Sequence, residues 1–545
     1  MAITVTAVSA TEKVYLYEEP RALSGPVILF EGDVCHVQLA VKSDRWYQYG
    51  SLRLTGGAAA RAARVSRVGY VPAVFDVAPD ADDYYEARPE KVYPDVLEPV
   101  DLRRINCQAG YNQTFYLTIR DSERIPVGES RITATFSING EKRAKTTFLV
   151  RKLAVRLPKQ KCISTCWMHY DSIEAQHNVR LFSREFYRVF ASYLDAAAYS
   201  GQNMLLVPIF TPAFDTEPGT ERRTAQLLDI REDADGNFSF DFTAMHRFIA
   251  FAREHGMEYL EMPPLFTQWG AKHAPKIMVR GVNGRLRRRF GWDTDALSDE
   301  YRRFLTQLLP ALVAELRSVG MEERTFFHVS DEPHIDHLAH YNACKALVMP
   351  LLGDRCRTLD ACSDLAYVGK TEREYSVCAE NTVDKYIEAG VKPLCTYFCC
   401  SQRMGYMPNR FIAMPHQRLL VLGALLYKYD MDLFLQWGFN FYNTFLSRRE
   451  ISPYGNTDCD IHYPAGDAFI VYPDTAAGCC RPSVRLMATR EMFRLSRILY
   501  LLEEKLGREA VLAILREEGI ENFGSYPREA GWIDGFLYRL CEKLT

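Results

Sequence analysis

Two adjacent carboxylates, Asp331 and Glu332, are the side chains in this sequence best suited to catalysis. They follow the apolar run 325–330 and precede Pro333, which stops a strand from continuing. Neighbouring residues of an extended chain point to opposite sides, so the two carboxyl groups enter different surroundings and acquire different pKa values. One protonated and one ionised carboxyl group are what glycosidic bond cleavage requires. The structural alternative is that Asp331 only caps a helix.

Aromatic and polar side chains follow several other predicted strands. Sugar rings bury their C–H faces on aromatic side chains, while their hydroxyl groups need polar partners. The candidate substrate-binding residues are Trp167, His169, Asp171, Trp269, His273, Tyr397, Trp437 and Asn440. Among them, Tyr397 is predicted to be a hydrogen-bond partner and Trp437 a sugar platform. A single tryptophan more often packs in a core, but several at strand ends together favour a glycan site.

A conventional glycosidase needs a second carboxylate opposite the acid. Predicted strands seven and eight end in 397–400 and 437–440, and neither segment contains Asp or Glu. Asp171, Asp215 and Asp364 remain as loop candidates. The pattern favours substrate assistance, in which the 2-acetamido oxygen of an N-acetylhexosamine attacks its own anomeric carbon. The protein then supplies only an acid and a carboxylate that orients the amide.

The spacing of apolar residues changes along the chain and indicates which helices and strands position these side chains. Residues 1–157 show short alternating apolar runs between turns, which predicts an N-terminal β-sandwich, with the acidic stretch 76–99 as a long surface loop inside it. Residues 158–505 alternate compact apolar strands with helical segments. Eight such βα units predict an α/β fold, a (β/α)8 TIM barrel. Residues 506–545 predict a short helical tail packed on the barrel.

The predicted barrel strands place the candidate residues at one end of the barrel. They lie near 162–167, 204–210, 259–265, 326–329, 358–361, 375–379, 394–398 and 433–438. Catalytic side chains of TIM barrels lie at the C-terminal ends of the strands, and the acid pair follows the fourth one directly.

Composition restricts the partners. The chain has 545 residues, with 66 basic and 69 acidic side chains and a net charge of −3. This balance disfavours a nucleic-acid or membrane-surface binder and favours a small molecule or glycan. The first residues resemble no secretory signal, and fifteen cysteines, an odd number, are predicted to be reduced thiols, so we expect a cytoplasmic protein.

Two further patterns have structural explanations. His334, His337 and His340 spread over about 120° of a helix, so we expect a solvated face and no metal site. We expect no cofactor either. The arginine run 280–289 either contacts an acidic group of a glycan or forms a solvated hairpin, and the hairpin is favoured because charge runs usually face solvent.

Five stretches carry a resemblance to a known family. They read CWMHYDSI, PIFTPAFDTEPGTERRTAQL, LFTQWGAKHAPKIM, FFHVSDEPH and FLQWGFNFYN. Over about residues 160–505 the chain resembles the barrel of glycoside hydrolase family 123 and the related domain of unknown function 4091, with a weaker match over the β-sandwich. The resemblance implies a β-N-acetylgalactosaminidase-like fold and a retaining, substrate-assisted mechanism. It implies that Asp331 orients and stabilises the acetamido group and that Glu332 is the acid and then the base.

The predicted function is hydrolysis of terminal β-linked N-acetylhexosamine, above all N-acetylgalactosamine, from a glycan or glycoside. Two alternatives remain open. One is a conventional two-carboxylate glycosidase that acts on a non-acetamido sugar and uses a loop Asp as nucleophile. The other is a non-catalytic glycan-binding protein that has kept the barrel.

Overall fold

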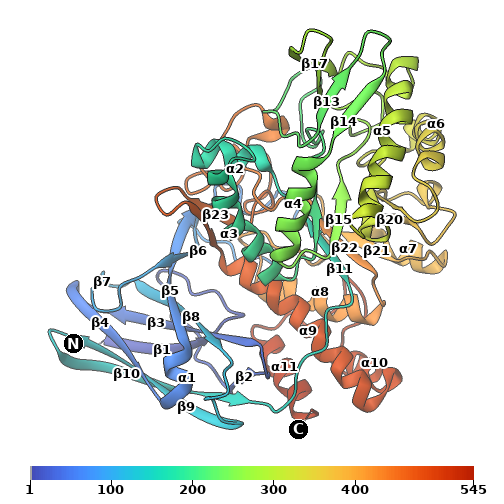
Figure 1. The fold of residues 1–545 in the computed structure, drawn as a ribbon. Helices are drawn as coiled ribbons and strands as arrows, with labels where there is room; N and C mark the ends of the chain where they lie inside the picture. Colours follow the sequence, from blue (N-terminus) through green and yellow to red (C-terminus); the bar gives the residue numbers. More distant parts are fainter. Residues whose placement is uncertain (1–2, 545) are drawn as a thin grey trace.

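The computed structural model describes residues 3–544, which form two main parts lying side by side (Figure 1). A β-rich part, blue to cyan in Figure 1, comes first in the chain, and a barrel with its covering helices follows. The last helices lie along the barrel on the side next to the β-rich part. This arrangement confirms the predicted fold class, a TIM barrel after a β-rich N-terminal part and before a helical tail.

The N-terminal part is a sandwich of two five-stranded sheets. One sheet contains, in spatial order, β1 (Ile3–Ser9), β3 (Val34–Ser43), β8 (Asn112–Arg120), β5 (Ala63–Pro72) and β6 (Val92–Pro99). The other contains β2 (Val27–Leu29), β10 (Glu141–Lys152), β9 (Gly128–Ile138), β4 (Tyr47–Thr55) and β7 (Ile105–Cys107). In β9 the alternate residues Ile132, Ala134, Phe136 and Ile138 are buried between the sheets, as a strand period of two requires.

The barrel is closed by eight parallel strands, each at a position predicted from the sequence. In spatial order they are β11 (Ile163–Cys166), β12 (Met204–Leu206), β15 (Tyr259–Met262), β18 (Thr325–Phe327), β19 (Arg357–Ala361), β20 (Glu374–Ala379), β21 (Cys395–Tyr397) and β22 (Leu433–Gln436). Their residues are almost all buried, because side chains fill the barrel on one face and helices cover the other.

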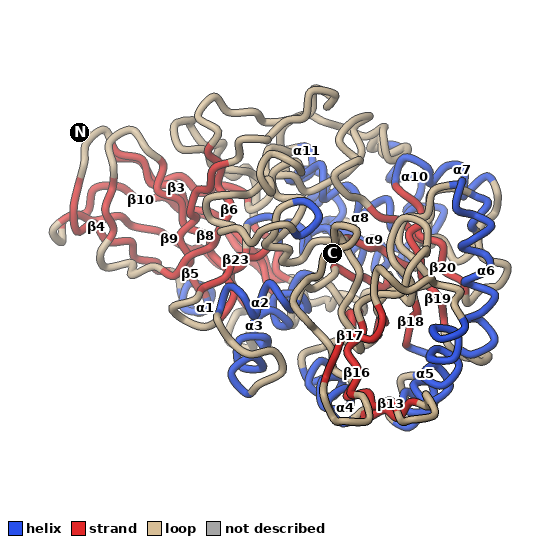
Figure 2. Tube along the Cα trace, turned by 90° about the horizontal axis from the view of Figure 1, so that it is seen from above, coloured by secondary structure: helices blue, strands red, loops and turns tan. Residues whose placement is uncertain are grey.

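Eleven α-helices occur among the described residues, and those around the barrel form its outer layer (Figure 2). They are α1 (Gly57–Ala62), α2 (Tyr170–His177), α3 (Arg184–Ser200), α4 (Thr243–Glu254), α5 (Asp299–Ser318), α6 (Leu338–Val348), α7 (Val383–Glu388), α8 (His416–Lys428), α9 (Val484–Leu506), α10 (Arg508–Glu517) and α11 (Trp532–Glu542). Helix α5 shows why they form. The Ser298 side chain caps its first turn, and Leu305, Leu308 and Leu312 recur on its buried face.

Two small sheets extend the barrel loops. A four-stranded sheet contains β14 (Phe238–Asp241), β13 (Asp229–Glu232), β16 (Ile277–Arg280) and β17 (Leu286–Phe290) and projects from the end of the barrel at the top of Figure 1. A hairpin of β23 (Val471–Asp474) and β24 (Cys479–Pro482) follows the last barrel strand. The first of these sheets borders the region where substrate is expected to enter.

The stretch 76–99 is not one long surface loop, so that prediction was wrong. Its second half forms β6, which pairs with β5 and carries Asp95 into contact with the barrel. Arg485 of α9 donates two hydrogen bonds to Asp95, at 2.9 and 2.7 Å, and both side chains are buried. Arg418 of α8 likewise donates two hydrogen bonds, each of 2.8 Å, to the two carboxylate oxygens of Asp82. The acidic residues of this stretch therefore act as counter-charges for buried arginines of the barrel.

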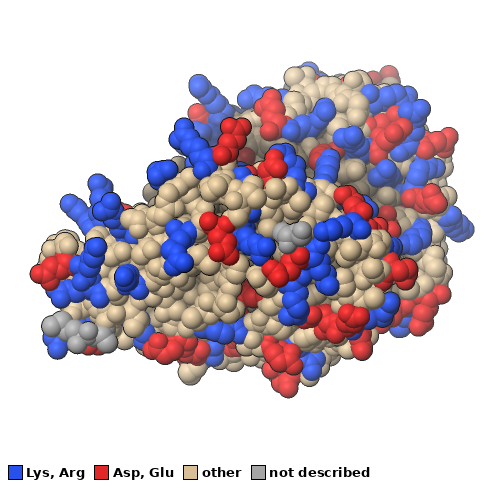
Figure 3. Space-filling view, turned by 90° about the horizontal axis from the view of Figure 1, so that it is seen from below, with Lys and Arg blue, Asp and Glu red and all other residues tan. Residues whose placement is uncertain are grey.

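Charges of both signs are interspersed on the face shown in Figure 3. This mixture agrees with the near-zero net charge of the sequence. Among residues 3–544 no helix is both long enough and apolar enough to cross a bilayer.

Candidate active site

The acid pair lies where strand β18 leads out of the barrel. Beyond the strand, the backbone amides of Val329 and Ser330 donate to the Asp360 carboxylate, at 3.0 and 3.2 Å, instead of continuing the ladder. Glu332 then adopts a left-handed backbone with φ of 41°. The extended chain expected from the sequence thus stops short of Asp331 and Glu332, and a turn separates their carboxyl groups.

Both carboxylates line one cavity of about 220 Å³ at the mouth of the barrel. Asp331 is half-buried, and Glu332 opens to the cavity. A third acid, Asp215, lines the same space. The aromatic wall includes Trp167, Trp269, Tyr397, Trp437 and Tyr463. This combination of flat apolar rings and a few charged groups suits a sugar ring.

Three residues of the cavity hold a strained backbone. Asp215, Trp269 and Glu332 have φ values of 40°, 59° and 41°, in the left-handed region that side chains with a Cβ seldom adopt. Such conformations persist only where the surrounding contacts impose them, and they occur often at binding and catalytic sites. With these backbone conformations, all three residues line the same cavity.

Tyr397, at the end of β21, holds the Glu332 carboxyl group. Its hydroxyl donates a hydrogen bond of 2.7 Å to Glu332 Oε1. Desolvation raises the pKa of Glu332 above its usual range, and the Tyr397 hydrogen bond opposes part of that rise. Glu332 therefore keeps a proton at a pH where an ordinary glutamate has lost it, as a general acid must.

A buried histidine lies behind the acid pair. The side chain of His328 is fully buried, with Nε2 2.5 Å from Glu261 Oε1 and Nδ1 3.4 Å from Asp360 Oδ1. Burial lowers the pKa of His328, but the two carboxylates outweigh it and raise the pKa to about 10. His328 is therefore an imidazolium at neutral pH. His328 was not among the predicted site residues, although it lies three positions before Asp331 in the same apolar run.

Opposing effects act on the pKa of Asp331. Burial and the neighbouring Glu332 raise the pKa of Asp331 well above its usual range, and the positive charge of His328 lowers it. Two like charges this close do not both ionise easily, so the two carboxyl groups release their protons in separate steps. The pKa values of both carboxyl groups therefore lie above their usual ranges, and the His328 charge opposes part of the rise at Asp331.

Two of the predicted tryptophans are fixed by buried acids. The Trp167 indole nitrogen donates to Glu261 at 2.7 Å, and its ring stacks on Phe214 with centroids 3.7 Å apart. The Trp437 indole nitrogen donates to Asp467 at 3.0 Å. Trp437 lies half-buried in the cavity wall with its ring 5.1 Å from that of Tyr463. Both indoles are thus held in one orientation.

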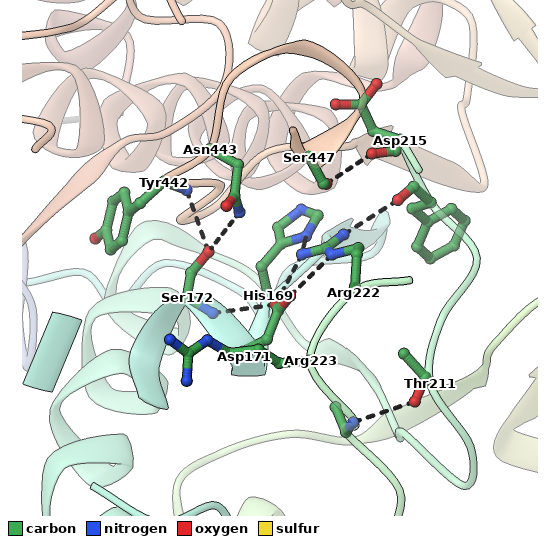
Figure 4. Close-up of polar contacts among 12 residues, drawn as sticks. His169, Asp171, Ser172, Thr211, Asp215, Arg222, Arg223, Tyr442, Asn443 and Ser447 are labelled. Atoms are coloured by element: carbon green, nitrogen blue, oxygen red, sulfur yellow. Dashed lines mark hydrogen bonds and ion pairs between the residues drawn. The ribbon is translucent and has the colours of Figure 1, made fainter. Parts of the chain in front are cut away.

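His169 and Asp171 do not line this cavity; they form a buried cluster with Arg222 (Figure 4). Arg222 donates two hydrogen bonds to the Asp171 carboxylate, at 2.8 and 2.7 Å, and its Nη2 lies 3.2 Å from His169 Nδ1. Burial and the Arg222 charge lower the pKa of His169 to about 3, so the ring is neutral. Arg222 also donates to the carbonyl of Phe214, so this cluster supports the cavity wall from behind.

His273 and Asn440 are also absent from the cavity lining. The Asn440 side chain is fully buried, accepting from the His169 amide at 2.9 Å and donating to the His169 carbonyl at 3.0 Å. It joins the loop after β22 to the loop after β11. His273 is half-buried, and its ring lies 5.8 Å from that of Trp292.

Several cavity residues were not among the predicted binding residues, and Asp215 and Gln268 are the polar ones with the most informative contacts. Asp215, considered only as a loop acid, accepts hydrogen bonds from the Tyr463 hydroxyl at 2.9 Å and the Leu446 amide at 3.2 Å. Burial raises the pKa of Asp215 to about 6 despite the Tyr463 hydrogen bond. Gln268 accepts from the Asp215 amide at 2.6 Å, while its buried Nε2 has no partner among residues 3–544. That nitrogen is a donor available to a sugar hydroxyl.

The histidines after the acid pair and the arginine run lie outside the catalytic cavity. Within residues 3–544 no group of three or more His, Cys, Asp or Glu side chains has the geometry to hold a metal. The run 280–289 extends from the last residue of β16 through the turn into β17, and several of its arginines pair with acids. Arg280 pairs with Asp229, Arg289 with Glu232 and Glu300, and Arg288 with Glu221 and Asp293.

Residues 167–502 match the family described as Glycoside hydrolase 123, catalytic domain. The match includes every barrel strand after the first and all residues of the cavity described above. The chain belongs to glycoside hydrolase family 123. Its catalytic activity is therefore glycoside hydrolysis, a reaction that most glycoside hydrolase families carry out with a pair of carboxyl groups.

A solved structure of a family 123 enzyme agrees with this chain in fold. A family 123 glycoside hydrolase from Clostridium perfringens, studied for glycolipid glycan hydrolysis, has a TM-score of 0.74 and 14% identity, with 99% of this chain and 97% of that one covered. A family 39 glycoside hydrolase from Bacteroides cellulosilyticus WH2 has a TM-score of 0.34 and 10% identity, over 87% and 82% of the two chains. No curated protein matches the chain.

Proposed function

We propose that this family 123 hydrolase removes terminal β-linked N-acetylgalactosamine with retention of configuration, using the 2-acetamido group of the substrate as nucleophile. The observation that carries the proposal is the position of Asp331 and Glu332, adjacent in the chain and both open to one aromatic cavity. A sugar that supplies its own nucleophile needs one carboxyl group beside the glycosidic oxygen and a second beside the acetamido group, which attacks the opposite face of the reacting carbon. The turn at Glu332, which separates the two carboxyl groups, is compatible with this division.

In the first step, Glu332 donates its proton to the glycosidic oxygen as the bond from that oxygen to the anomeric carbon breaks. The acetamido oxygen forms a bond to the same carbon, which gives a cyclic oxazolinium. Asp331 accepts a hydrogen bond from the acetamido N–H and stabilises the positive charge that develops there. In the second step, Glu332 takes a proton from water, which opens the ring from the side that the leaving group has vacated.

One observation favours the conventional two-carboxylate mechanism as a second candidate. Asp215 lines the same cavity and is supplied by a different loop. Both of its carboxylate oxygens already accept hydrogen bonds, from the Tyr463 hydroxyl and the Leu446 amide. A nucleophile held by two donors is less reactive, so Asp215 is better suited to binding a sugar hydroxyl.

Inhibition by a thiazoline tests the proposed mechanism. We expect the purified protein to hydrolyse an aryl β-N-acetylgalactosaminide, and the thiazoline analogue of N-acetylgalactosamine to inhibit competitively because it imitates the cyclic intermediate. The matching aryl β-galactoside, which has a 2-hydroxyl group, should not be cleaved. Cleavage of both glycosides at similar rates would instead support Asp215 as nucleophile. Binding of the sugar without any turnover would support a glycan-binding protein.

Replacement of Tyr397 by Phe should shift the basic limb of the pH profile. The general acid must be protonated, so kcat/KM falls as pH rises through the pKa of Glu332. The Tyr397 hydroxyl lowers that pKa, so its loss in Tyr397→Phe should move the limb to higher pH, by about 0.7 unit for a hydrogen bond of about 1 kcal/mol.

Tyr367→Phe is the matched control, because the Tyr367 hydroxyl donates to the backbone carbonyl of His334, outside the cavity. Its basic limb should coincide with that of the unsubstituted protein. A limb that stays in place or moves to lower pH in Tyr397→Phe would contradict the assignment of Glu332 as the acid.

A further inference from the structure

A second cavity, of about 320 Å³, opens beside the catalytic one. It lies between the loop that follows β12 and the sheet that contains β16 and β17. Its lining includes Thr216, Lys276, Arg288, Trp292 and Asp293. None of these residues lines the catalytic cavity.

The two cavities share their walls. In the loop after β12, Ala213 and Thr216 face the second cavity, whereas the intervening Phe214 and Asp215 face the catalytic one. The loop after β15 behaves in the same way, because Thr267 lines the second cavity and the next two residues line the first. The two cavities therefore lie on opposite sides of these two loops, and a ligand longer than one sugar that is held at the acid pair would reach the second cavity by passing over the loops.

The second cavity contains an aromatic ring in a fixed orientation. Trp292 is half-buried, and its indole nitrogen donates to the carbonyl of Thr220 at 3.0 Å. That hydrogen bond satisfies the polar edge of the ring and leaves its apolar faces for contacts. Sugar rings stack on such faces through their C–H groups.

A chain of ion pairs surrounds this ring. Glu221 lies 2.8 Å from Lys276 Nζ and 2.9 Å from Arg288 Nε, and Arg288 also donates to Asp293 at 2.6 and 3.0 Å. Because each charge is held by its neighbours, these groups present hydrogen-bond donors and acceptors in fixed positions. Fixed polar groups beside an aromatic ring are what recognition of sugar hydroxyl groups requires.

The charges of the second cavity cancel. Lys276 and Arg288 are balanced by Glu221 and Asp293, and the remaining cation of the lining, Arg222, is neutralised by Asp171. An anionic ligand would have to compete with acids that already hold both basic groups. The electrostatics therefore favour an uncharged, hydroxyl-rich ligand.

We propose that the second cavity is a subsite for a neutral sugar of the aglycone, bound against Trp292 and the Glu221–Arg288 pair. This inference rests on the proposed function, because the ligand must continue from a hexosamine held at Asp331 and Glu332. It assigns a role to Arg288, one member of the arginine run, as an orienting partner for a neutral glycan. The enzyme should accordingly prefer an oligosaccharide to a glycoside with a small aglycone.

Paired substrates test the subsite. One is an aryl β-N-acetylgalactosaminide, and the other is a trisaccharide in which the same hexosamine precedes two neutral hexoses. The measured quantity is kcat/KM for the trisaccharide divided by kcat/KM for the aryl glycoside. In Trp292→Ala we expect this ratio to fall about tenfold, mainly through KM for the trisaccharide.

Two further variants make the comparison interpretable. Trp46→Ala removes a tryptophan that is 58% exposed on the sandwich, and its ratio should equal that of the unsubstituted protein. Glu221→Gln keeps the side-chain shape but removes the charge that holds Lys276 and Arg288, and its ratio should also fall. Thermal melting shows whether each variant is folded, and the Glu221 variant provides the test if Trp292→Ala is not.

The outcomes separate the two proposals. Failure of the unsubstituted protein to cleave either substrate would overturn the proposed function. Normal cleavage with an unchanged ratio in Trp292→Ala and Glu221→Gln would overturn the subsite and leave the proposed function intact. A trisaccharide with an anionic second sugar that is cleaved better than the neutral one would overturn the assignment of a neutral ligand.

Discussion

Glu332→Gln should lower kcat for a glycoside with a poor leaving group by about a thousandfold, within the usual range for loss of a general acid. The amide of Gln keeps the size of the side chain and accepts the Tyr397 hydrogen bond, but it has no proton of suitable acidity to give to the leaving oxygen. KM should change little because the shape of the cavity is retained. Steady-state kinetics with an alkyl or oligosaccharide aglycone measures this effect.

The leaving group provides the sharper comparison for Glu332. Dinitrophenolate leaves without being protonated. On a dinitrophenyl glycoside, Glu332→Gln should therefore lower the rate of glycosidic bond cleavage much less than on a glycoside with a poor leaving group. The matched control is Glu323→Gln, which changes an exposed glutamate paired with Arg355 outside the cavity and should have normal kinetics. An equal loss on both leaving groups would show that Glu332 is not the proton donor.

Asp331→Asn should lower kcat by about a hundredfold to a thousandfold, a typical loss when one group that stabilises transition-state charge is removed from a water-poor site. Ring closure of the acetamido group places positive charge near its nitrogen. In the proposed mechanism the ionised carboxyl group of Asp331 stabilises that nitrogen, whereas a neutral amide does not. Unlike the Glu332 variant, this variant should remain slow on the dinitrophenyl glycoside, because the acetamido oxygen attacks in the same step in which the leaving group departs. A good leaving group therefore does not replace the stabilisation that Asp331 gives to the acetamido group.

Asp364→Asn is the matched control for Asp331. Asp364 caps a short helical turn by accepting from the Ala366 amide at 2.9 Å, and it does not line the cavity. Its substitution should leave kcat unchanged on both glycosides. Retention of more than a tenth of kcat in Asp331→Asn would contradict the role of Asp331, and a large loss in Asp364→Asn would favour a loop aspartate as nucleophile.

The fold was largely predictable because its signal is periodic. All eight barrel strands appear in the sequence as short apolar runs. This pattern is expected because a strand that is buried on both faces does not alternate apolar and polar residues. Strand ends were less predictable. β12 stops at Leu206, whereas its apolar run continues to Phe210, because residues beyond the ladder stay buried in loops around the barrel mouth. Composition made 76–99 resemble a solvent-facing loop, since its acids pair with arginines that are far away in sequence.

The candidate site was predictable where a side chain directly follows a strand. Asp331, Glu332, Tyr397 and Trp437 follow or end strands of one barrel, and the structure places all four in one cavity. Tyr397 contacts Glu332, a partner that spacing alone does not identify. The catalytic and binding roles of these residues stay predictions that the kinetic experiments test.

For the other side chains, the sequence does not distinguish residues that line the cavity from residues that lie behind its wall. His169 and Asp171 have residue types typical of a sugar site, yet Arg222, fifty-one positions beyond Asp171, holds both behind the wall. Asp215 and Tyr463 enter the cavity from long loops after different strands, and their contact joins positions 248 residues apart. Loop conformation of this kind depends on tertiary contacts, which neither hydrophobic period nor motif spacing records.

The arginines that reach from the barrel helices to Asp82 and Asp95 bear on how this protein can be engineered. Deleting the sandwich to obtain a smaller biocatalyst would remove Asp82 and Asp95, the acids that pair with Arg418 and Arg485. It would also expose apolar residues of the barrel part such as Phe469, which packs in one cluster with Tyr93 and Val96 of the sandwich, and an exposed apolar patch favours aggregation. The sandwich is therefore not a detachable module, and redesign of the catalytic half begins from the entire polypeptide.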